Sequence, residues 1–169
     1  MNNESVIIAI TRKDGGLSLM SLLVVGRGNV LPSGAAWLED GWWARPSTDA
    51  VVESEIAKAN EPGSWVSWRR LQPGDLQEDR TYRDAWIDTG AAIVHDMPKA
   101  REIHRKHLRA RRAAAMADLD GQWMRATGQG KKADADAIEA ERQKWRDAPA
   151  DQRIDAAQTI EELKAVSGP

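Results

Sequence analysis

The sequence predicts an α+β protein, in which a small Trp-rich antiparallel sheet with one helix is followed by an antiparallel helical hairpin. A strand-like apolar run turns back at Asp14-Gly15-Gly16, which is typical of a β-hairpin. Six of the eight Trp lie before residue 90, and from Asp96 onward the chain is charged, Ala-rich and periodic in the manner of helices. We therefore expect a small α+β domain over residues 1–95 and a helical arm over residues 96–169.

The N-terminal hairpin consists of two apolar runs joined by a tight turn. Ser5–Thr11 is rich in β-branched residues and predicts a largely buried strand. Gly15 and Gly16 tolerate the positive φ angles of a two-residue turn. Leu17–Met20 then returns antiparallel to the first strand, and Leu22–Val25 continues it.

A loop and a short helix follow the hairpin. Gly26–Pro46 is rich in Gly, Pro and Trp, and predicts a loop with one short strand near Trp42. Ser47 or Thr48 can cap a helix that runs to about Asn60, before a Pro-Gly pair that ends it.

The last part of this domain has weaker patterns. Trp65–Leu71 mixes Trp and Val with polar residues and predicts a strand. A Pro-Gly turn leads to Asp79–Trp86, which predicts a short helical or irregular segment. Ala91–Val94 is apolar, and its pattern does not separate a strand from a helix.

The arm is predicted to contain two long helices and one short one. Asp96 is a good N-cap, and Pro98 is tolerated in the first turn of the first helix. The break at Gly128–Gly130 is short, so the second helix, Ala133–Asp147, should pack antiparallel to the first. Thr159–Glu162 fits the capping box of a final short helix.

The Trp side chains are expected to dominate the core of the N-terminal domain, because each can bury ~150–250 Å². A Trp cluster can also be an interface hot spot or a sugar-stacking platform, and burial is the interpretation that we favour. Trp42 and Trp43 are an exception. Neighbouring residues of a strand point to opposite faces, so one of these two rings is expected to be exposed.

The composition excludes several classes of function. The chain has no Cys, which rules out disulfides, thiolate catalysis and Cys-based zinc sites. Its formal net charge of −2 gives no overall attraction to nucleic acid or to a membrane. The apolar runs are far shorter than the ~20 residues of a membrane span, and the first residues lack the basic region of a signal peptide. We expect a soluble protein made in the cytoplasm.

A basic stretch opens the arm. Lys99–Arg112 holds seven Lys or Arg and one Glu, which fits either a phosphate-binding helix or a solvated helix face. Antiparallel packing should bring Asp147, Asp151 and Asp155 toward this stretch. We therefore favour the solvated face over nucleic-acid binding. A basic groove for an acidic protein partner lies between these two interpretations.

No constellation for catalysis or metal binding stands out. His95, His104 and His107 are interpreted as ordinary surface histidines, because Arg and Lys surround the last two and would repel a cation. The sequence contains neither a phosphate-binding loop motif nor a catalytic triad order or a distinctive carboxylate pair. We predict a protein that is not an enzyme and that carries no cofactor or metal.

Three stretches resemble small proteins encoded beside tail-fibre genes in phages and prophages. Asp79–Trp86 is similar to a short Asp-Arg-x-(Tyr/Phe)-Arg-x-Ala-Trp pattern in those proteins. Arg112–Asp120 and Glu141–Pro149 resemble the two parts of the C-terminal module of phage tail and tail-fibre assembly chaperones. The chain departs from that module in three places, with Gly121 where the module has Trp, Glu141 where it has Tyr and Trp145 where it has Leu.

The resemblance implies a non-enzymatic phage protein that acts in tail or tail-fibre assembly, in the host cytoplasm, by binding another virion protein. The alternatives are a structural virion component whose arm serves for oligomerisation, and a host-factor or nucleic-acid binder. The arm would offer an amphipathic groove or helix face to its partner, with surrounding basic residues setting the orientation. The expected apolar seam consists of Ile103, Leu108, Leu119, Trp123, Ile138 and Trp145. The expected basic contacts are Arg105, Arg109 and Arg112.

Overall fold

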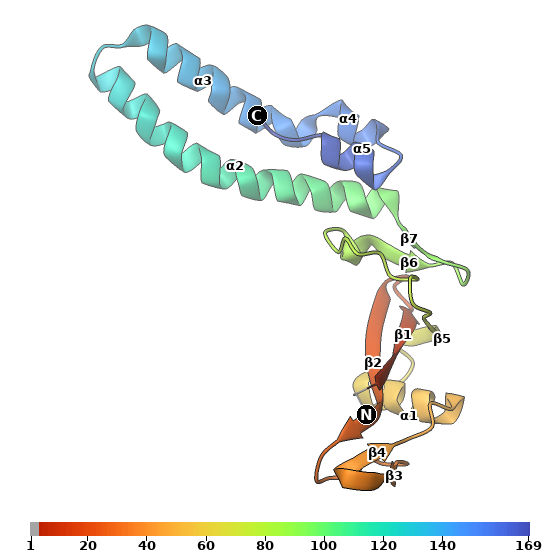
Figure 1. The fold of residues 1–169 in the computed structure, drawn as a ribbon. Helices are drawn as coiled ribbons and strands as arrows, with labels where there is room; N and C mark the ends of the chain where they lie inside the picture. The colour runs from red at the N-terminus through yellow and green to blue at the C-terminus, as the bar shows by residue number, and fades with distance from the viewer. Residues whose placement is uncertain (1–3) are drawn as a thin grey trace. The chain divides into compact units, whose positions relative to one another are not determined.

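A computed structural model describes residues 4–169 of the chain (Figure 1). The architecture is mixed α+β, as the sequence predicts. The chain divides into two compact units, one ending at Val94 and the other comprising His95–Pro169. This boundary lies one residue before the predicted one.

The first unit contains an antiparallel five-stranded sheet with the strand order β3-β4-β2-β1-β5. A separate strand pair, β6–β7, and one α-helix complete this part of the chain. The bounds are β1 Glu4–Arg12, β2 Leu17–Arg27, β3 Ala36–Trp37, β4 Trp42–Ala44, α1 Asp49–Ala59, β5 Trp65–Arg70, β6 Trp86–Asp88 and β7 Ile93–His95. Of the segments with ambiguous patterns, the one around Ile93 is a strand, and Arg83–Ala85 forms a single 3₁₀ turn.

The predicted N-terminal hairpin is present as β1 and β2. Gly15 has a φ of 77°, a conformation that favours glycine, at the turn between the strands. The turn is held by the Gly16 N–H, which donates to Asp14 Oδ1 at 2.8 Å, and by the Arg12 N–H, which donates to Gly16 O at 2.9 Å. Both contacts are local, which explains why the sequence alone predicts this hairpin.

Strand β1 is buried on both faces, because its alternate side chains enter two different apolar clusters. Figure 1 shows α1 lying beside the β1–β2 ribbon. The cluster on the α1 side consists of Ile8, Ile10, Leu22, Val52 and Ile56. The second cluster consists of Ala9, Leu71, Trp86 and Ile93.

The expectation of a Trp-dominated core is wrong in part. Trp43 and Trp86 are buried, but Trp65 and Trp68 are only partly buried and pack at the margin of the α1 cluster. Trp37 is 48% exposed. Aliphatic side chains form the centre of the α1 cluster instead. Of the adjacent pair, Trp43 is the buried ring and its neighbour is half-buried.

The second unit is a helical hairpin followed by a C-terminal segment with two short helices. The bounds are α2 Met97–Gly128, α3 Lys132–Asp147, α4 Gln152–Ala156 and α5 Ile160–Ala165. Asp96 caps α2 as predicted, with its Oδ1 accepting the Lys99 N–H at 3.3 Å. Gly130, with a φ of 67°, reverses the chain between the two long helices.

The C-terminal segment packs against the first half of α2, whereas α3 packs antiparallel against the second half. Every third residue of the segment is buried, a period that the sequence analysis did not detect: Ile154, Ala157, Ile160, Leu163 and Val166. The predicted cap is present, since Thr159 Oγ1 accepts the Glu162 N–H at 3.1 Å. Glu162 Oε2 reaches back to the Gln158 N–H at 2.7 Å, one residue before the usual position in a capping box.

Candidate partner-binding site

The predicted apolar seam lies mostly inside the second unit. Leu108 and Trp145 are only 1% and 9% exposed, so the chain itself covers them. Leu119, Trp123 and Ile138 are partly buried along the α2–α3 contact. The seam residues therefore join the two helices, and of the set only the partly buried members present surface to a partner.

Ile103 does not belong to the same stripe as Leu108. At about 100° per helical residue, five positions place the two side chains about 140° apart around α2. Ile103 is half-buried, while Leu108 points into the contact with the C-terminal part of the unit. The sequence reasoning grouped them because both are apolar, although spacings of three or four residues are needed for a common face.

Trp145 packs between α2 and the end of the described chain. The Arg111 guanidinium lies 5.8 Å from the centroid of its ring. A Cβ placed on Gly168 would lie 2.5 Å from Trp145 Cζ3, so the ring rests directly on the glycine backbone. This one side chain thus contacts two segments that are distant in sequence.

A charged network on the hairpin was missed by the sequence analysis. Arg142 of α3 forms an ion pair with Asp120 of α2, with an Nη2–Oδ1 distance of 2.7 Å, and its guanidinium lies 5.5 Å from the Trp123 ring centroid. Arg142 and Arg146 also contact Glu139, and the pKa of Glu139 is lowered, chiefly by the hydrogen bond from Arg146 and then by the charges of both guanidinium groups. The spacing of Glu139 and Arg142 at i, i+3 was the available sequence signal.

The basic stretch on α2 is partly neutralised by its own chain. Arg105 Nη2 lies 2.6 Å from Asp155 Oδ1, and Arg101 Nη2 donates to the Ala157 carbonyl at 2.8 Å. The prediction for Asp155 is therefore confirmed. The other two carboxylates bind residues close in sequence instead, Asp147 accepting from Gln143 and Asp151 from Arg153.

Arg109 and Arg112 have no carboxylate partner within 4.0 Å among residues 4–169. Arg109 is exposed and Arg112 is half-buried on α2. Of the three predicted basic contacts, Arg105 thus serves an internal ion pair, and Arg109 is the most accessible to another molecule.

His104 is not a surface histidine, contrary to the sequence interpretation. It is buried against the C-terminal segment, and its Nε2–H donates to the Val166 carbonyl at 2.8 Å. Burial is the main cause that lowers the pKa of His104, and nearby positive charges add to this effect. A neutral His104 therefore links α2 to the end of α5.

The turn between α2 and α3 carries the most open apolar surface of the second unit. A pocket of about 280 Å³ lies there, and Met124 beside it is 68% exposed. We call this surface the turn pocket. It is lined by Trp123, Thr127, Gly130, Lys132, Ala135 and Asp136.

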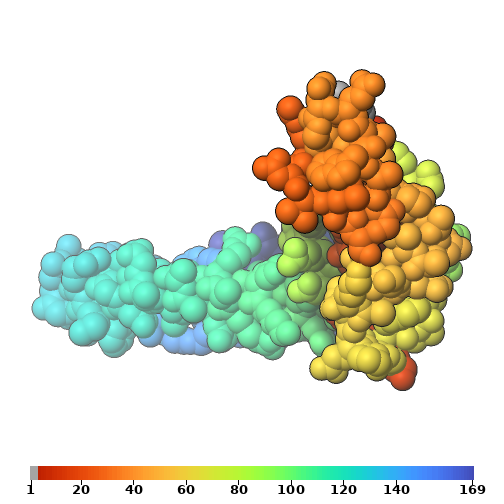
Figure 2. Space-filling view, turned by 90° about the horizontal axis from the view of Figure 1, so that it is seen from below, coloured from red at the N-terminus to blue at the C-terminus, as the bar shows by residue number. Residues whose placement is uncertain are grey.

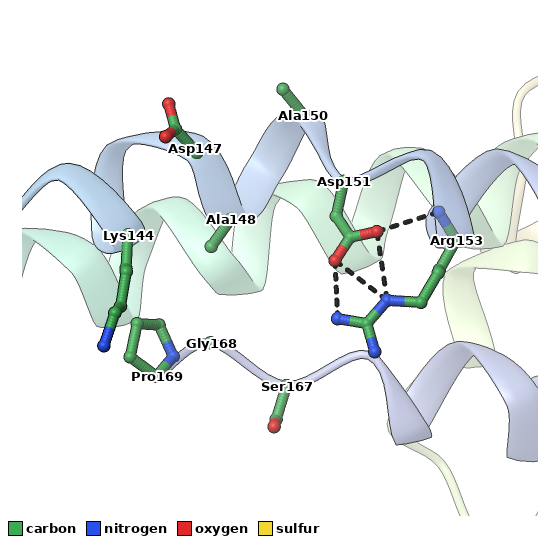
Figure 3. Close-up of a pocket in the computed structure, with 9 residues that line it drawn as sticks. All are labelled: Lys144, Asp147, Ala148, Ala150, Asp151, Arg153, Ser167, Gly168 and Pro169. Carbon is green, nitrogen blue, oxygen red and sulfur yellow. Dashed lines mark hydrogen bonds and ion pairs between the residues drawn. The ribbon is translucent and has the colours of Figure 1, made fainter. Parts of the chain in front are cut away.

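A larger pocket of about 700 Å³ lies where the end of α3 meets the C-terminal segment (Figure 3). Figure 3 shows the Arg153 guanidinium folded onto Asp151, with an Nη2–Oδ2 distance of 2.6 Å. Asp151 Oδ1 also accepts the Arg153 N–H at 2.9 Å, and these contacts with Arg153 lower the pKa of Asp151. This carboxylate is therefore used to begin α4.

Two further searches of the described residues were negative. In residues 4–169, no three or more His, Asp or Glu side chains are placed to hold a metal ion. Over the same range, no helix combines the length and the apolar character needed to cross a membrane.

Comparisons with known proteins do not assign the chain to a family. A scan against protein-family models, a search of curated proteins and a search of solved structures each gave no match.

Proposed function

We propose that the protein is a non-enzymatic phage protein that acts in tail or tail-fibre assembly by binding another virion protein. The observation that carries the proposal is the way the hairpin joins two of the stretches that resemble the assembly chaperones. Asp120 ends the first stretch and Arg142 lies in the second, and their ion pair of 2.7 Å connects α2 to α3. Residues that resemble one module are thus part of one structural element.

The stretch Asp79–Trp86 supports the proposal in a different way. Its Tyr82, Ala85 and Trp86 are buried, and burial raises the pKa of Tyr82. The pattern shared with the phage proteins is therefore a packing motif of the first unit. These buried side chains cannot contact a partner, so we assign partner binding to exposed surfaces elsewhere on the chain.

The turn pocket is the surface on which we expect the virion protein to bind. It is lined by the partly buried Trp123, the next residue of α2 is the exposed Met124, and aromatic and Met side chains are enriched at interface cores. Lys132 and Asp136 border the pocket and can orient a partner. A helix laid against this end of the hairpin is the form of recognition that fits.

The test is co-expression of the tagged full chain with the tail and fibre proteins of its phage, followed by pull-down and quantification of each recovered protein. Recovery of one tail or fibre protein, reduced about tenfold or more in Trp123→Ala/Met124→Ala, is the expected result. Val66→Ala, which changes an exposed apolar residue of the first unit, should bind as the native chain does.

Mass spectrometry of purified particles separates the possible roles. Absence from the particle fits an assembly chaperone that acts in the host cytoplasm. A fixed copy number in the particle would make the protein a structural virion component instead. Recovery of host proteins or nucleic acid alone would overturn the proposal and direct attention to the basic face of α2.

A further inference from the structure

The loop between β2 and β4 carries exposed apolar side chains on a rigid backbone. Val30 is 81% exposed and Trp37 is 48% exposed, with Leu31 and Leu38 open beside them. We call these four residues the loop patch. Figure 2 shows the orange segment that contains them lying open at the surface. Grouped exposed apolar residues of this kind usually mark an interaction surface.

Hydrogen bonds hold the loop in one conformation. The Gly28 N–H donates to Gly41 O at 3.1 Å, and the Leu38 N–H donates to Trp42 O at 2.7 Å. Arg27 Nε donates to the carbonyl of Asp40, which has a φ of 55°, the only positive φ of a non-glycine residue in the described part of the chain. Asp adopts this left-handed conformation more readily than most residues, and the hydrogen bond from Arg27 fixes it there.

Trp37 is supported by a buried neighbour on the adjacent strand. It pairs across the strands with Trp43, which is buried against β2, where a Cβ on Gly26 would lie 2.5 Å from its ring. β3, which carries Trp37, is an edge strand of the sheet. Little ordering entropy is therefore lost when a partner covers the Trp37 ring.

The charge beside the loop patch indicates the chemistry of that partner. Residues 28–44 contain Glu39 and Asp40 and no Lys, Arg or His, and with the Arg27 guanidinium, which donates to the Asp40 carbonyl, the formal charge at this loop is still negative. Neither carboxylate lies within ion-pair distance of a basic group among residues 4–169, and both are exposed. The complement of this surface is a basic surface on which a flat aromatic ring can rest.

The same chain offers such a surface on α2. Lys106, Arg109, Ala110 and Ala113 are exposed and lie within about 100° of one another around the helix, with the exposed Glu102 one turn before Lys106. The two basic side chains have no carboxylate partner in the described residues, and the alanines let a ring approach the helix closely. Lys or Arg beside a Trp ring adds a cation–π attraction.

We propose that the loop patch of one copy docks on this basic face of α2 in a second copy. Trp37 rests on Ala110 and Ala113, and Glu39 and Asp40 face Lys106 and Arg109. Because each copy carries both surfaces, the contact either closes reciprocally in a two-fold dimer or runs head-to-tail into a closed ring or an open chain of subunits. The proposal is independent of the partner that binds at the turn pocket.

Sedimentation velocity of the full chain over a range of concentrations and salt tests the proposal. We expect concentration-dependent association that weakens as salt increases, because the contact joins exposed opposite charges. Trp37→Ala and Glu39→Lys/Asp40→Lys should each weaken association about tenfold or more. Combining Glu39→Lys/Asp40→Lys with Lys106→Glu/Arg109→Glu should restore it. Glu53→Lys/Asp134→Lys, a reversal of one exposed acid on α1 and one on α3, should have no comparable effect.

A cross-linking experiment identifies the two surfaces directly, since the native chain has no Cys. Mixing Ala36→Cys chains with Ala110→Cys chains under oxidising conditions should give a disulfide-linked pair of the two variants. Circular dichroism confirms that each variant is folded. A protein that stays monomeric at all concentrations would overturn the proposal, and so would association that does not change with the charge reversals. A third contrary result would be a cross-link that forms only when both Cys substitutions are placed in the same chain, and then only within that chain.

Discussion

The two units of this protein are stabilised by different distributions of buried surface. In the first unit, apolar side chains lie on both faces of β1 and share the core among strands and α1. In the second unit, one long helix is covered along its length by α3 and then by the C-terminal segment. The first core is a cluster, and the second is a row. In a row, each buried side chain has fewer buried neighbours that can compensate when it is removed. Loss of one side chain should therefore cost more stability in the second unit.

The ionic contacts differ in the same way. Arg69 of β5 forms two ion pairs, from Nε to Asp88 Oδ2 of β6 at 2.9 Å and from Nη1 to Asp75 Oδ2, in the turn after β5, at 3.0 Å. The side chain of Asp88 is largely buried. In the hairpin, Arg142 joins Asp120, whose side chain is half exposed. The first unit thus has an ion pair that is largely buried between its strands, whereas the second has ion pairs on the surface of its helices.

Loss of Trp145 should give the largest effect on the second unit. Trp145→Ala removes a buried ring that contacts Gly168 and lies near Arg111, and we expect the free energy of unfolding of this unit to fall by about 3–5 kcal/mol. Urea unfolding combined with hydrogen exchange, read separately for the two units, measures the loss. Trp123→Ala, at a partly exposed position, should cost less. Equal losses of unfolding free energy for the two changes would contradict the expectation that the buried Trp145 contributes more to the second unit than Trp123 does.

Arg69 and Arg142 provide a direct comparison between the two units. Arg69→Met leaves Asp88 buried without its cation and should destabilise the first unit by about 3 kcal/mol. Arg142→Met removes a partly exposed pair and should destabilise the second unit by only about 0.5–1 kcal/mol. Chemical unfolding of both variants checks the ratio. A larger loss for Arg142 than for Arg69 would show that the hairpin depends on its surface charges.

The second unit alone should respond to pH through His104. Burial lowers the pKa of this side chain in the folded state, so the unfolded chain takes up the proton first as the pH falls. The contribution to stability is complete above the ordinary His value of about 6.5 and is lost as the pH falls through the lowered pKa. Arg105, His107 and Arg111 lie near enough to lower it further.

Urea midpoints followed from neutral to mildly acidic pH test this dependence. His104→Gln should flatten the profile of the second unit, because an amide can still donate to Val166 O and does not titrate. His107→Gln, at an exposed position one turn away, should retain it. An unchanged profile in His104→Gln would exclude His104 as the group responsible.

The helix caps provide the smallest and most local comparison. Thr159 accepts the Glu162 N–H at the start of α5, so Thr159→Ala should cost about 1 kcal/mol. Thr48 occupies the same position before α1 but makes no side-chain cap hydrogen bond, and Thr48→Ala should cost close to nothing. Thermal melting of the two variants provides the measurement. A greater loss from Thr48→Ala would mean that its side chain contributes through another contact.

Local signals in the sequence account for the elements that were predicted with close bounds. The Asp14-Gly15-Gly16 turn, the Asp96 cap and the Thr159 cap act over a few residues, and each is present. Prediction was poorer where contacts between distant segments decide the structure. The two residues of β3 form a strand only because β4 lies beside them, and α4 is too short to have a periodic pattern of its own.

The candidate site shows the same limit. The arm was correctly predicted as a hairpin, because charged helical sequence on both sides of a short Gly break permits little else. The burial and exposure of its side chains were not predicted correctly. Nothing local distinguishes the buried His104 from the exposed His107, since both stand among basic residues. Only the C-terminal segment, which arrives from 60 residues further along the chain, decides which of the two is covered.

Sequence patterns were enough to predict the α+β class, the N-terminal hairpin, the ends of the long helices and the absence of cysteine chemistry. These follow from turn residues, caps, periodicity and composition, which are properties of short segments. The tertiary structure alone decided the strand order, the burial of Leu108 and Trp145, and the exposure of Trp37 and Met124. Burial depends on which distant segment covers a side chain, and the sequence near that side chain does not contain this information.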